Sequence, residues 1–447
     1  MDESSGLEFL DVHPFVRPTV LDRVRGTIIG GALGDAVGLY TEFLSKDLVR
    51  DAYPEGKFQL VEPATELRND GHRNKFVKTA WTDDTDHALL LLFSFVHTDG
   101  KFLRPTDFAK RLQFWCEQGL RCLDRLPLGL GRTVGSVVCD NKFLDDPIGT
   151  AYRHWRNSNC NAAPNGSLMR THPLGIICLG LTLEETFQLA ADFSRVTHAD
   201  PRCIVSCCLS TALIRGMLRG EVTSEQDVDE MITRSALWVK TWMEEENHLK
   251  EGTMELPQLY STFDHEEYDK HVHVESLDEL ELDDSMKMGY VYKTLGAGIF
   301  MLRCAMRRVN HLSLCEQPNA LFEELITSLV LQGGDADTNA TAAGALVGAL
   351  LGYSQLPSKW KDGLMHGQWL LHKCNGLASV VRISPFIPPY KGSSDTDAAL
   401  DGGKPPLNRQ QLYDREHAFM MEYMTKTEMA ARVKKNSSGW VDKWFRK

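Results

Sequence analysis

Residues 19–40 read TVLDRVRGTIIGGALGDAVGLY, and this stretch decides the fold. Its apolar side chains recur at helical spacing, with Val24, Ile28, Ala32 and Ala36 on one face. Glycines at positions 30, 31, 34 and 38 lie in the same segment, although each glycine inside a helix costs about 1 kcal/mol. We therefore expect a helix that another helix, or a ligand, approaches closely.

Helical spacing also dominates the rest of the chain, and the period-two pattern of strands is hard to find. Further helices are expected near residues 84–98, 106–122, 183–196, 201–219, 225–247, 288–308 and 319–332. Residues 339–353 are rich in Ala and Gly, which predicts a second closely packed helix. The sequence therefore predicts an all-α fold with one helical domain over residues 19–390.

The negative charge of the chain is concentrated in one segment. The formal charge at pH 7 is −12, and residues 244–285 carry fifteen Asp or Glu against two Lys, so the remainder is nearly neutral. This composition predicts a solvated, mobile insertion that folding does not require. No basic stripe stands out elsewhere, so nucleic acid is not an expected partner.

The two ends of the chain are expected to differ from the domain between them. Residues 1–18 should form an irregular lead-in, and residues 391–408 have the composition of a linker. A helical tail is expected over about 409–435, within the terminal segment 391–447. Its apolar side chains, Phe419, Met420, Tyr423 and Met424, predict docking on the same chain in preference to a second subunit. A monomer is favoured, and the oligomeric state stays open.

The cellular compartment follows from weaker signals. The 11 cysteines are scattered without a Cys-x-x-Cys pair, and the acidic start MDESS does not resemble a signal peptide. No long apolar run lacks charge, so no membrane partner is expected. A cytoplasmic protein is expected, with the nucleus as the alternative.

Two acidic motifs carry the functional signal. Residues 81–86 read WTDDTD and residues 333–340 read GGDADTNA, each beside an apolar helical run. Convergence of two buried carboxylate clusters would be strongly repulsive unless a cation lay between them. Carboxylate and hydroxyl oxygens suit Mg²⁺, Mn²⁺ or Ca²⁺, so a binuclear metal centre is expected. Helix capping by Thr and Asp would explain either motif alone, and Glu42 adds a further carboxylate or is an exposed acid at a helix end.

Two polar turns come before helices, and a third segment is rich in glycine. Residues 165–170 read NGSLMR, a turn whose amides could hold a phosphate with Arg170 adding charge, although many Asn-Gly turns are only turns. His198 either contacts a ligand or caps the next helix, and the cap is favoured. Residues 129–135 read GLGRTVG, which is neither a Walker A loop nor a dinucleotide fingerprint.

These motifs occur in a specific order: GGALGD at 30–35 with Glu42, WTDDT at 81–85, NGSLMR at 165–170, TH at 197–198 and GGDADTN at 333–339. The set resembles the ADP-ribosylglycohydrolase family, which includes ADP-ribosylarginine hydrolase, ADP-ribosylserine hydrolase and the dinitrogenase reductase-activating glycohydrolase. The resemblance covers about residues 20–375. It implies an all-α orthogonal helical bundle that releases ADP-ribose from ADP-ribosylated protein side chains or small conjugates by cleaving the bond at the ribose C1″.

The resemblance also implies which residues form the site. Two Mg²⁺ or Mn²⁺ ions would be held by oxygen-bearing residues of both motifs: Thr82, Asp83, Asp84, Asp335, Asp337 and Thr338. The catalytic residues would be among the acids Glu42, Asp83 and Asp84. The ADP-ribose cleft would be lined by Gly131, Asn165, Gly166, Ser167 and His198.

One position departs from the pattern of arginine-directed members. Some of them carry an aspartate in the glycine-rich segment, and the matching position here falls near Gly129, where there is no acid. This favours an O-linked substrate such as ADP-ribosylserine over ADP-ribosylarginine, unless Asp86 supplies the missing carboxylate. Two alternatives remain: a pseudoenzyme that binds ADP-ribose, against which the intact acidic clusters argue, and a binuclear-metal phosphohydrolase.

Overall fold

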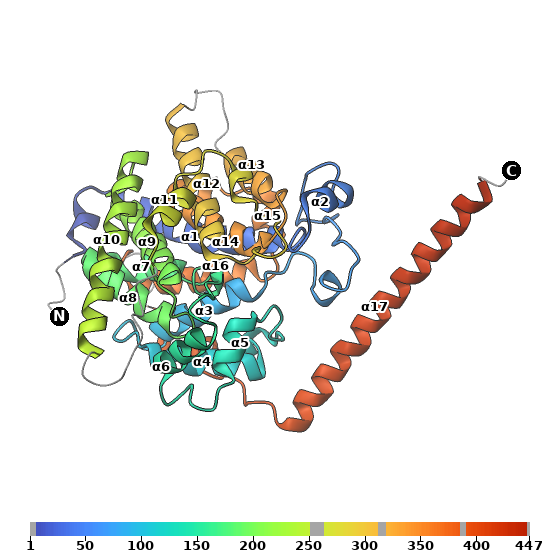
Figure 1. Ribbon diagram of the computed structural model, residues 1–447, viewed down its shortest axis with the longest axis horizontal. Helices are drawn as coiled ribbons and strands as arrows, with labels where there is room; N and C mark the ends of the chain where they lie inside the picture. Colours follow the sequence, from blue (N-terminus) through green and yellow to red (C-terminus); the bar gives the residue numbers. More distant parts are fainter. Residues whose placement is uncertain (1–5, 251–262, 312–318, 385–389, 445–447) are drawn as a thin grey trace.

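The computed structural model describes residues 6–250, 263–311, 319–384 and 390–444. These residues form helices joined by loops, and no β-strand occurs among them (Figure 1). The expected all-α fold is confirmed. The α-helices are α1 Val16–Gly38, α2 Lys46–Ala52, α3 Asp83–Val96, α4 Pro105–Gln118, α5 Arg132–Val138, α6 Pro147–Asn157, α7 His172–Ile177, α8 Leu183–Arg195, α9 Pro201–Arg219, α10 Glu225–Lys250, α11 His265–Val272, α12 Val291–His311, α13 Asn319–Val330, α14 Ala336–Leu351, α15 Ser358–Lys361, α16 Gly367–Val380 and α17 Arg409–Trp444.

The centre of the bundle is the pair α1 and α14, which pack backbone against backbone. A Cβ built on Gly30 would lie 2.4 Å from the carbonyl oxygen of Gly344, and one built on Gly34 would lie 2.0 Å from that of Ala340. No side chain fits at such distances, so these glycines permit the close approach. The element that approaches the glycines in residues 19–40 is therefore a helix, which was one of the two alternatives expected from the sequence.

The helix boundaries agree with the sequence at the functional motifs and differ elsewhere. The hydroxyl of Thr82 accepts a hydrogen bond from the amide of Asp84 and begins α3, as expected. The expected irregular lead-in over 1–18 is wrong at its end, because α1 already begins at Val16. Pro18 lies in the first turn of α1, where a missing N–H leaves no hydrogen bond unmade.

Residues 263–285, the described second part of the acidic segment, are packed on the body. Helix α11 lies against α12, and the ring of Tyr268 is buried beside that of Tyr292, with ring centroids 5.7 Å apart. Val272, Leu280 and Leu282 are also buried. The expected solvated insertion is therefore wrong for this part, because its spaced apolar residues outweigh its acidic composition. Residues 251–262 lie outside the described residues.

The expected linker over 391–408 is also part of the packed body. Lys373, which is only 3% exposed, forms ion pairs with Asp395 at 2.6 Å and Asp397 at 2.8 Å. Ala398 is fully buried. The small polar residues that predicted a linker instead form two short turns anchored by a buried lysine.

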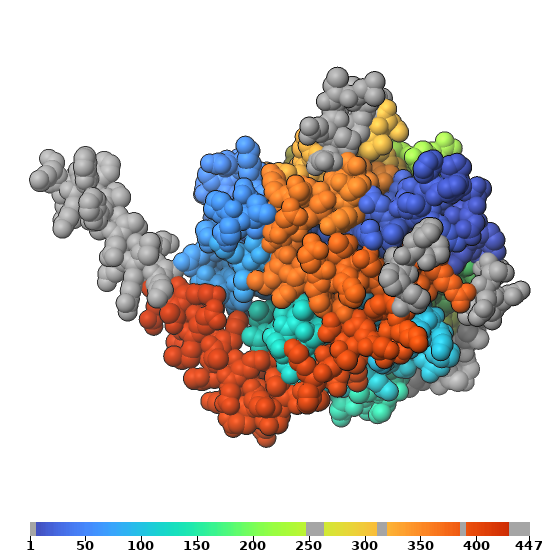
Figure 2. Space-filling model, turned by 180° about the vertical axis from the view of Figure 1, so that it is seen from behind, coloured from blue at the N-terminus to red at the C-terminus, as the bar shows by residue number. Residues whose placement is uncertain are grey.

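Helix α17 follows these turns (Figure 2) and extends away from the body toward the C-terminus (Figure 1). Near its middle, the Tyr423 hydroxyl donates to the carbonyl oxygen of Gly71 at 3.2 Å, and Arg415 donates to that of Gln118 at 2.8 Å. The tail thus contacts its own chain, as expected. Met420 and Met424 of the expected apolar face remain about half exposed.

One helix in the described ranges, α9, is long and apolar enough to cross a membrane by length and composition. In the fold, 94% of its apolar window is buried inside the protein, which is the environment of a core helix.

Candidate active site

A cavity of about 850 Å³ lies where α1 ends and where α3 and α14 begin. Its walls combine the acidic motifs with the polar turns that the sequence singled out. They include Glu42, Phe43, Asp83, Asp84, Gly129, Gly131, Asn165, Gly166, His198, Asp335, Asp337 and Thr338. Of the predicted site residues, Thr82 and Ser167 do not line it.

Asp35, a buried acid on α1, positions the first of the two motifs. Its carboxylate accepts hydrogen bonds from the amide of Thr82 at 2.8 Å, and from the amide and hydroxyl of Thr85 at 2.9 and 2.6 Å. Burial raises the pKa of Asp35 to about 6, although these hydrogen bonds favour the charged form. The start of α3 is therefore fixed directly to α1.

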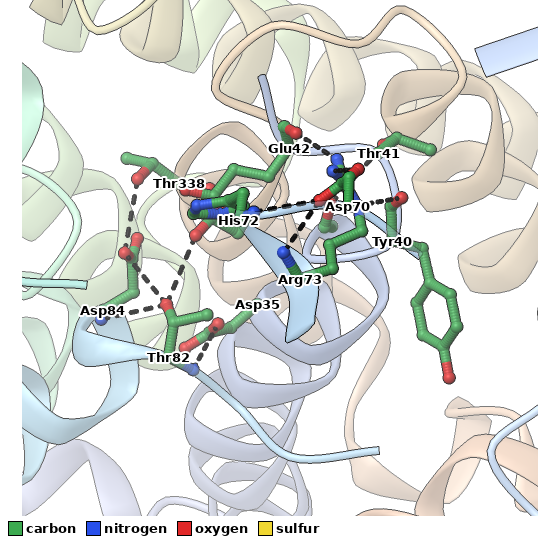
Figure 3. Close-up of polar contacts among 12 residues, drawn as sticks. Asp35, Tyr40, Thr41, Glu42, Asp70, His72, Arg73, Thr82, Asp84 and Thr338 are labelled. Carbon is green, nitrogen blue, oxygen red and sulfur yellow. Dashed lines mark hydrogen bonds and ion pairs between the residues drawn. The ribbon is translucent and has the colours of Figure 1, made fainter. Parts of the chain in front are cut away.

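The two acidic motifs meet across the cavity floor (Figure 3). The hydroxyl of Thr82 lies 3.3 Å from Oδ2 of Asp337, and the hydroxyl of Thr338 lies 3.3 Å from Oδ2 of Asp84. Each motif thus donates one threonine hydroxyl to a carboxylate of the other. The sequence expectation that the motifs converge is confirmed by these contacts.

The acids at this junction are in an unfavourable electrostatic state. Burial, followed by repulsion among neighbouring carboxylates, raises the pKa of Asp83, Asp84 and Asp337 well above the usual range. No lysine or arginine in the described residues forms an ion pair with them, and Oδ1 of Asp84 is buried without a partner. Oxygens of Glu42, Asp335 and Asp337 lie within 4.8 Å of one another. An oxygen-lined pocket with uncompensated charge fits hard divalent cations.

Glu42 follows α1 and is 6% exposed at the edge of this cluster. Burial raises its pKa, and the Nε2 atom of His72 lies 2.7 Å from its Oε2. Arg73, whose guanidinium is buried, donates to the backbone carbonyl oxygens of Glu42 and Tyr40 (Figure 3). The segment that carries His72 and Arg73 therefore fixes both the side chain and the backbone of Glu42.

The polar turn at 165–170 supports the acids from the other side. The side-chain amide nitrogen Nδ2 of Asn165 donates to Oδ2 of Asp335 and to the hydroxyl of Thr294, both at 2.9 Å. Ser167 is buried and accepts from the hydroxyl of Ser194 at 3.1 Å, away from the cavity. Asn165 therefore orients an acid, and the predicted substrate contact of Ser167 has no support in its position.

His198 presents one unpaired nitrogen beside the cavity. Its Nδ1 lies 2.7 Å from the hydroxyl of Thr197, and its buried Nε2 has no partner among the described residues. Burial, and secondly the charge of Arg170, lowers its pKa well below the usual value, which favours the neutral ring. Arg170 itself is 1% exposed and donates to Thr197 Oγ1, so it stands behind His198 and does not face the cavity. The favoured cap interpretation of His198 is wrong, because Asp200 caps α9.

The chain matches a known protein family. The family model described as ADP-ribosylglycohydrolase matches residues 16–384, which is most of the chain. The chain belongs to the ADP-ribosylglycohydrolase family. It is accordingly a glycosidic-bond hydrolase.

Relatives of this ADP-ribosylglycohydrolase are distant but extend over most of its length. An ADP-ribosylarginine hydrolase, Tri1, of Serratia proteamaculans is 25% identical over 81% of this chain and 81% of its own. Human ADP-ribosylhydrolase ARH3 is 25% identical over 76% of this chain and 89% of its own. A solved structure titled an ADP-ribosylglycohydrolase-related protein complex covers 81% of this chain with a TM-score of 0.50 and 21% identity, which supports the fold.

Two residues that position the site, Asp35 and His72, are not among the site residues that the sequence predicts. Asp35 could have been found, because it is the one acid in the apolar, glycine-rich part of α1 over residues 26–38 and needs a buried partner. His72 lies in a polar loop thirty residues after Glu42, and no local pattern connects the two.

Asp86, which could have supplied the acid missing near Gly129, does not reach the cavity. Its Oδ1 accepts from Nε1 of Trp81 at 2.7 Å, and its Oδ2 accepts from Nε1 of Trp115 at 3.0 Å. Arg125 forms an ion pair with it at 3.3 Å. Both oxygens are therefore occupied in the core, and Asp86 has a structural role.

Proposed function

We propose that this protein is a metal-dependent hydrolase that releases ADP-ribose by cleaving the glycosidic bond at the ribose C1″. Its substrates are ADP-ribosylated protein side chains or small ADP-ribosyl conjugates. Two Mg²⁺ or Mn²⁺ ions would be held by Thr82, Asp83, Asp84, Asp335, Asp337 and Thr338. The observation that carries the proposal is the pair of crossed threonine–carboxylate contacts, which join the two motifs at one cavity.

The residues of the cavity have distinct parts in this reaction. Cleavage at C1″ develops positive charge on the sugar, which the surrounding carboxylates stabilise. Divalent ions held by the acidic and threonine side chains named above would supply positive charge that offsets these carboxylates and would help to orient the ribose. Glu42 orients the attacking water or acts as base, because its Oε1 has no protein partner among the described residues. The unpaired Nε2 of His198 is placed to donate to an oxygen of the ADP-ribose.

We further propose an O-linked substrate such as ADP-ribosylserine. Gly129 has φ +94°, and a Cβ built on it would lie 2.0 Å from Oδ1 of Asp83. An aspartate at this position would collide with a proposed metal-holding residue, so the acid of arginine-directed members has no place here.

The direct test incubates the metal-loaded protein with an ADP-ribosylated protein and measures free ADP-ribose and AMP. Free ADP-ribose from the wild type supports the proposal, AMP would indicate a phosphohydrolase, and neither product would indicate a pseudoenzyme. Asp335→Asn should lose activity by at least about a hundredfold, because it removes charge from the metal cluster.

Asp145→Asn is the matched control for the acidic variant. Asp145 is exposed and lies outside the cavity. Equal loss in both variants would mean that general instability, and not the cluster, explains the result.

A further inference from the structure

The carboxylate of Glu42 has two oxygens in different surroundings. Oε2 is bonded to Nε2 of His72 at 2.7 Å, whereas no described residue is bonded to Oε1. A carboxylate only accepts hydrogen bonds, so His72 carries its proton on Nε2 and donates it. The hydrogen bond from His72 therefore leaves Glu42 one oxygen for the chemistry of the cavity.

The ring of His72 is itself held in one orientation. Its backbone amide donates to Oδ1 of Asp70 at 3.1 Å. The rings of Phe43 and Phe76 flank it, with centroids 5.1 and 5.3 Å away. His72 is thus held through its backbone and by two neighbouring aromatic rings.

Arg73, in the same segment as His72, has a different role, because it holds the backbone of the turn after α1. Its guanidinium donates to the backbone carbonyl oxygens of Tyr40 and Glu42 and pairs with Asp70 at 2.6 Å. The turn after α1 is therefore held by Arg73 without help from the imidazole. The contact made by His72 has no backbone to support and acts on the Glu42 carboxylate alone.

We propose that His72 is a positioning residue that keeps Oε2 of Glu42 away from the divalent cations, so that Glu42 acts through Oε1 on water or the leaving group. An oxygen of Glu42 lies within 4.8 Å of oxygens of Asp335 and Asp337, so a released carboxylate is near enough to become a chelating ligand. The proposal rests on the proposed function, because it assigns Glu42 a role beside bound metal.

The test compares wild type, His72→Ala and His72→Gln by titration with Mn²⁺ alone, and by kcat and KM on an ADP-ribosylated peptide. His72→Ala should bind Mn²⁺ at least about threefold more tightly, while kcat falls at least about tenfold and KM stays within about twofold. His72→Gln, whose amide can donate to Oε2, should recover most of both changes.

A double-mutant cycle isolates the contact. In a Glu42→Gln background, His72→Ala should leave the Mn²⁺ affinity unchanged, because the carboxylate that it releases is gone. The proposal is overturned if His72→Ala leaves kcat or Mn²⁺ affinity unchanged, or if it weakens Mn²⁺ binding. A wild type without hydrolase activity would refute the proposed function, while the Mn²⁺ titrations would still decide whether His72 restrains Glu42.

Discussion

Thr82 and Asp337 are separated by 255 residues in the sequence, yet the hydroxyl oxygen of Thr82 lies 3.3 Å from Oδ2 of Asp337. Both residues stand at helix starts, Thr82 before α3 and Asp337 in the first turn of α14. Helix α1 holds both starts, through Asp35 for α3 and through its glycine face for α14. The glycine-rich helix therefore determines how far apart the two halves of the acidic cluster lie.

The repulsion within this cluster should appear in the pH dependence of stability without metal. Burial and the neighbouring carboxylates raise the pKa of Asp84 in the folded state. The raised pKa therefore costs no stability at a pH where Asp84 is protonated in both the folded and the unfolded protein. The cost is largest at a pH where Asp84 is ionised in both. Stability should therefore fall as pH rises above about 4, the unfolded value. Metal-free Asp84→Asn should match wild type near pH 4 and exceed its Tm by at least about 2 °C near pH 8.

Metal should reverse that order. At about a hundredfold excess over Kd, a ligand bound to the folded state adds about 2.7 kcal/mol. Wild type should gain more from Mn²⁺ than Asp84→Asn does, and chelation should restore the metal-free order, in which Asp84→Asn is the more stable near pH 8. Calorimetry with Mn²⁺ and with chelator measures both effects. An Asn variant that is less stable at every pH without metal would contradict the explanation by repulsion.

The packing of α1 on α14 predicts a large cost for one added methyl group. Gly30→Ala would bring a Cβ to 2.4 Å from the carbonyl oxygen of Gly344, and backbone on both sides cannot yield easily. We expect a loss of about 2–4 kcal/mol in urea unfolding. Gly180→Ala is the control, because its Cβ would meet only Leu7 at 3.6 Å. Similar midpoints for the two variants would mean that the helices can separate without cost.

The sequence predicted the chemistry of the site better than its surroundings. The motifs around Asp83 and Asp337 could be recognised because acids beside apolar helices require a partner. That requirement can be seen in the sequence even when the partner is distant along the chain. The contact between Glu42 and His72 could not be predicted from the sequence, because it depends on the path of the loop that carries His72. Composition misled in residues 263–285, where a few apolar side chains at helical spacing determine packing despite the excess of acids.

Tyr268 tests the structural importance of that acidic segment. Its ring is fully buried, and its hydroxyl lies 3.2 Å from that of Ser235 on α10. Tyr268→Ala should cost about 3–5 kcal/mol, as other buried aromatic truncations do. Tyr413→Ala on α17, where the side chain is 62% exposed, should change little. Thermal melts of the two variants suffice, and equal melting temperatures would restore the view that the segment is dispensable.

Gly129 should govern which linkage the enzyme cleaves. Gly129→Ala places a Cβ against Asp83 in a left-handed backbone region, so activity should fall at least about tenfold with the fold retained. Gly135→Ala is the control. Gly135 lies on α5 in the same glycine-rich segment, and a Cβ added there would lie at an ordinary 3.4 Å from its nearest side chain.

The same position separates the two substrate classes. Wild type should hydrolyse ADP-ribosylserine peptides in preference to ADP-ribosylarginine peptides. Gly129→Asp should not gain arginine activity, because the new carboxylate would displace Asp83 from the cluster before it could reach the ribose. Asp86 cannot substitute, since both of its oxygens are bonded to buried tryptophans. Parallel assays of both peptides with the same preparation decide the matter. A wild-type preference for arginine would show that the guanidine can leave with the assistance of the metal cluster alone, and the O-linked assignment would then be wrong.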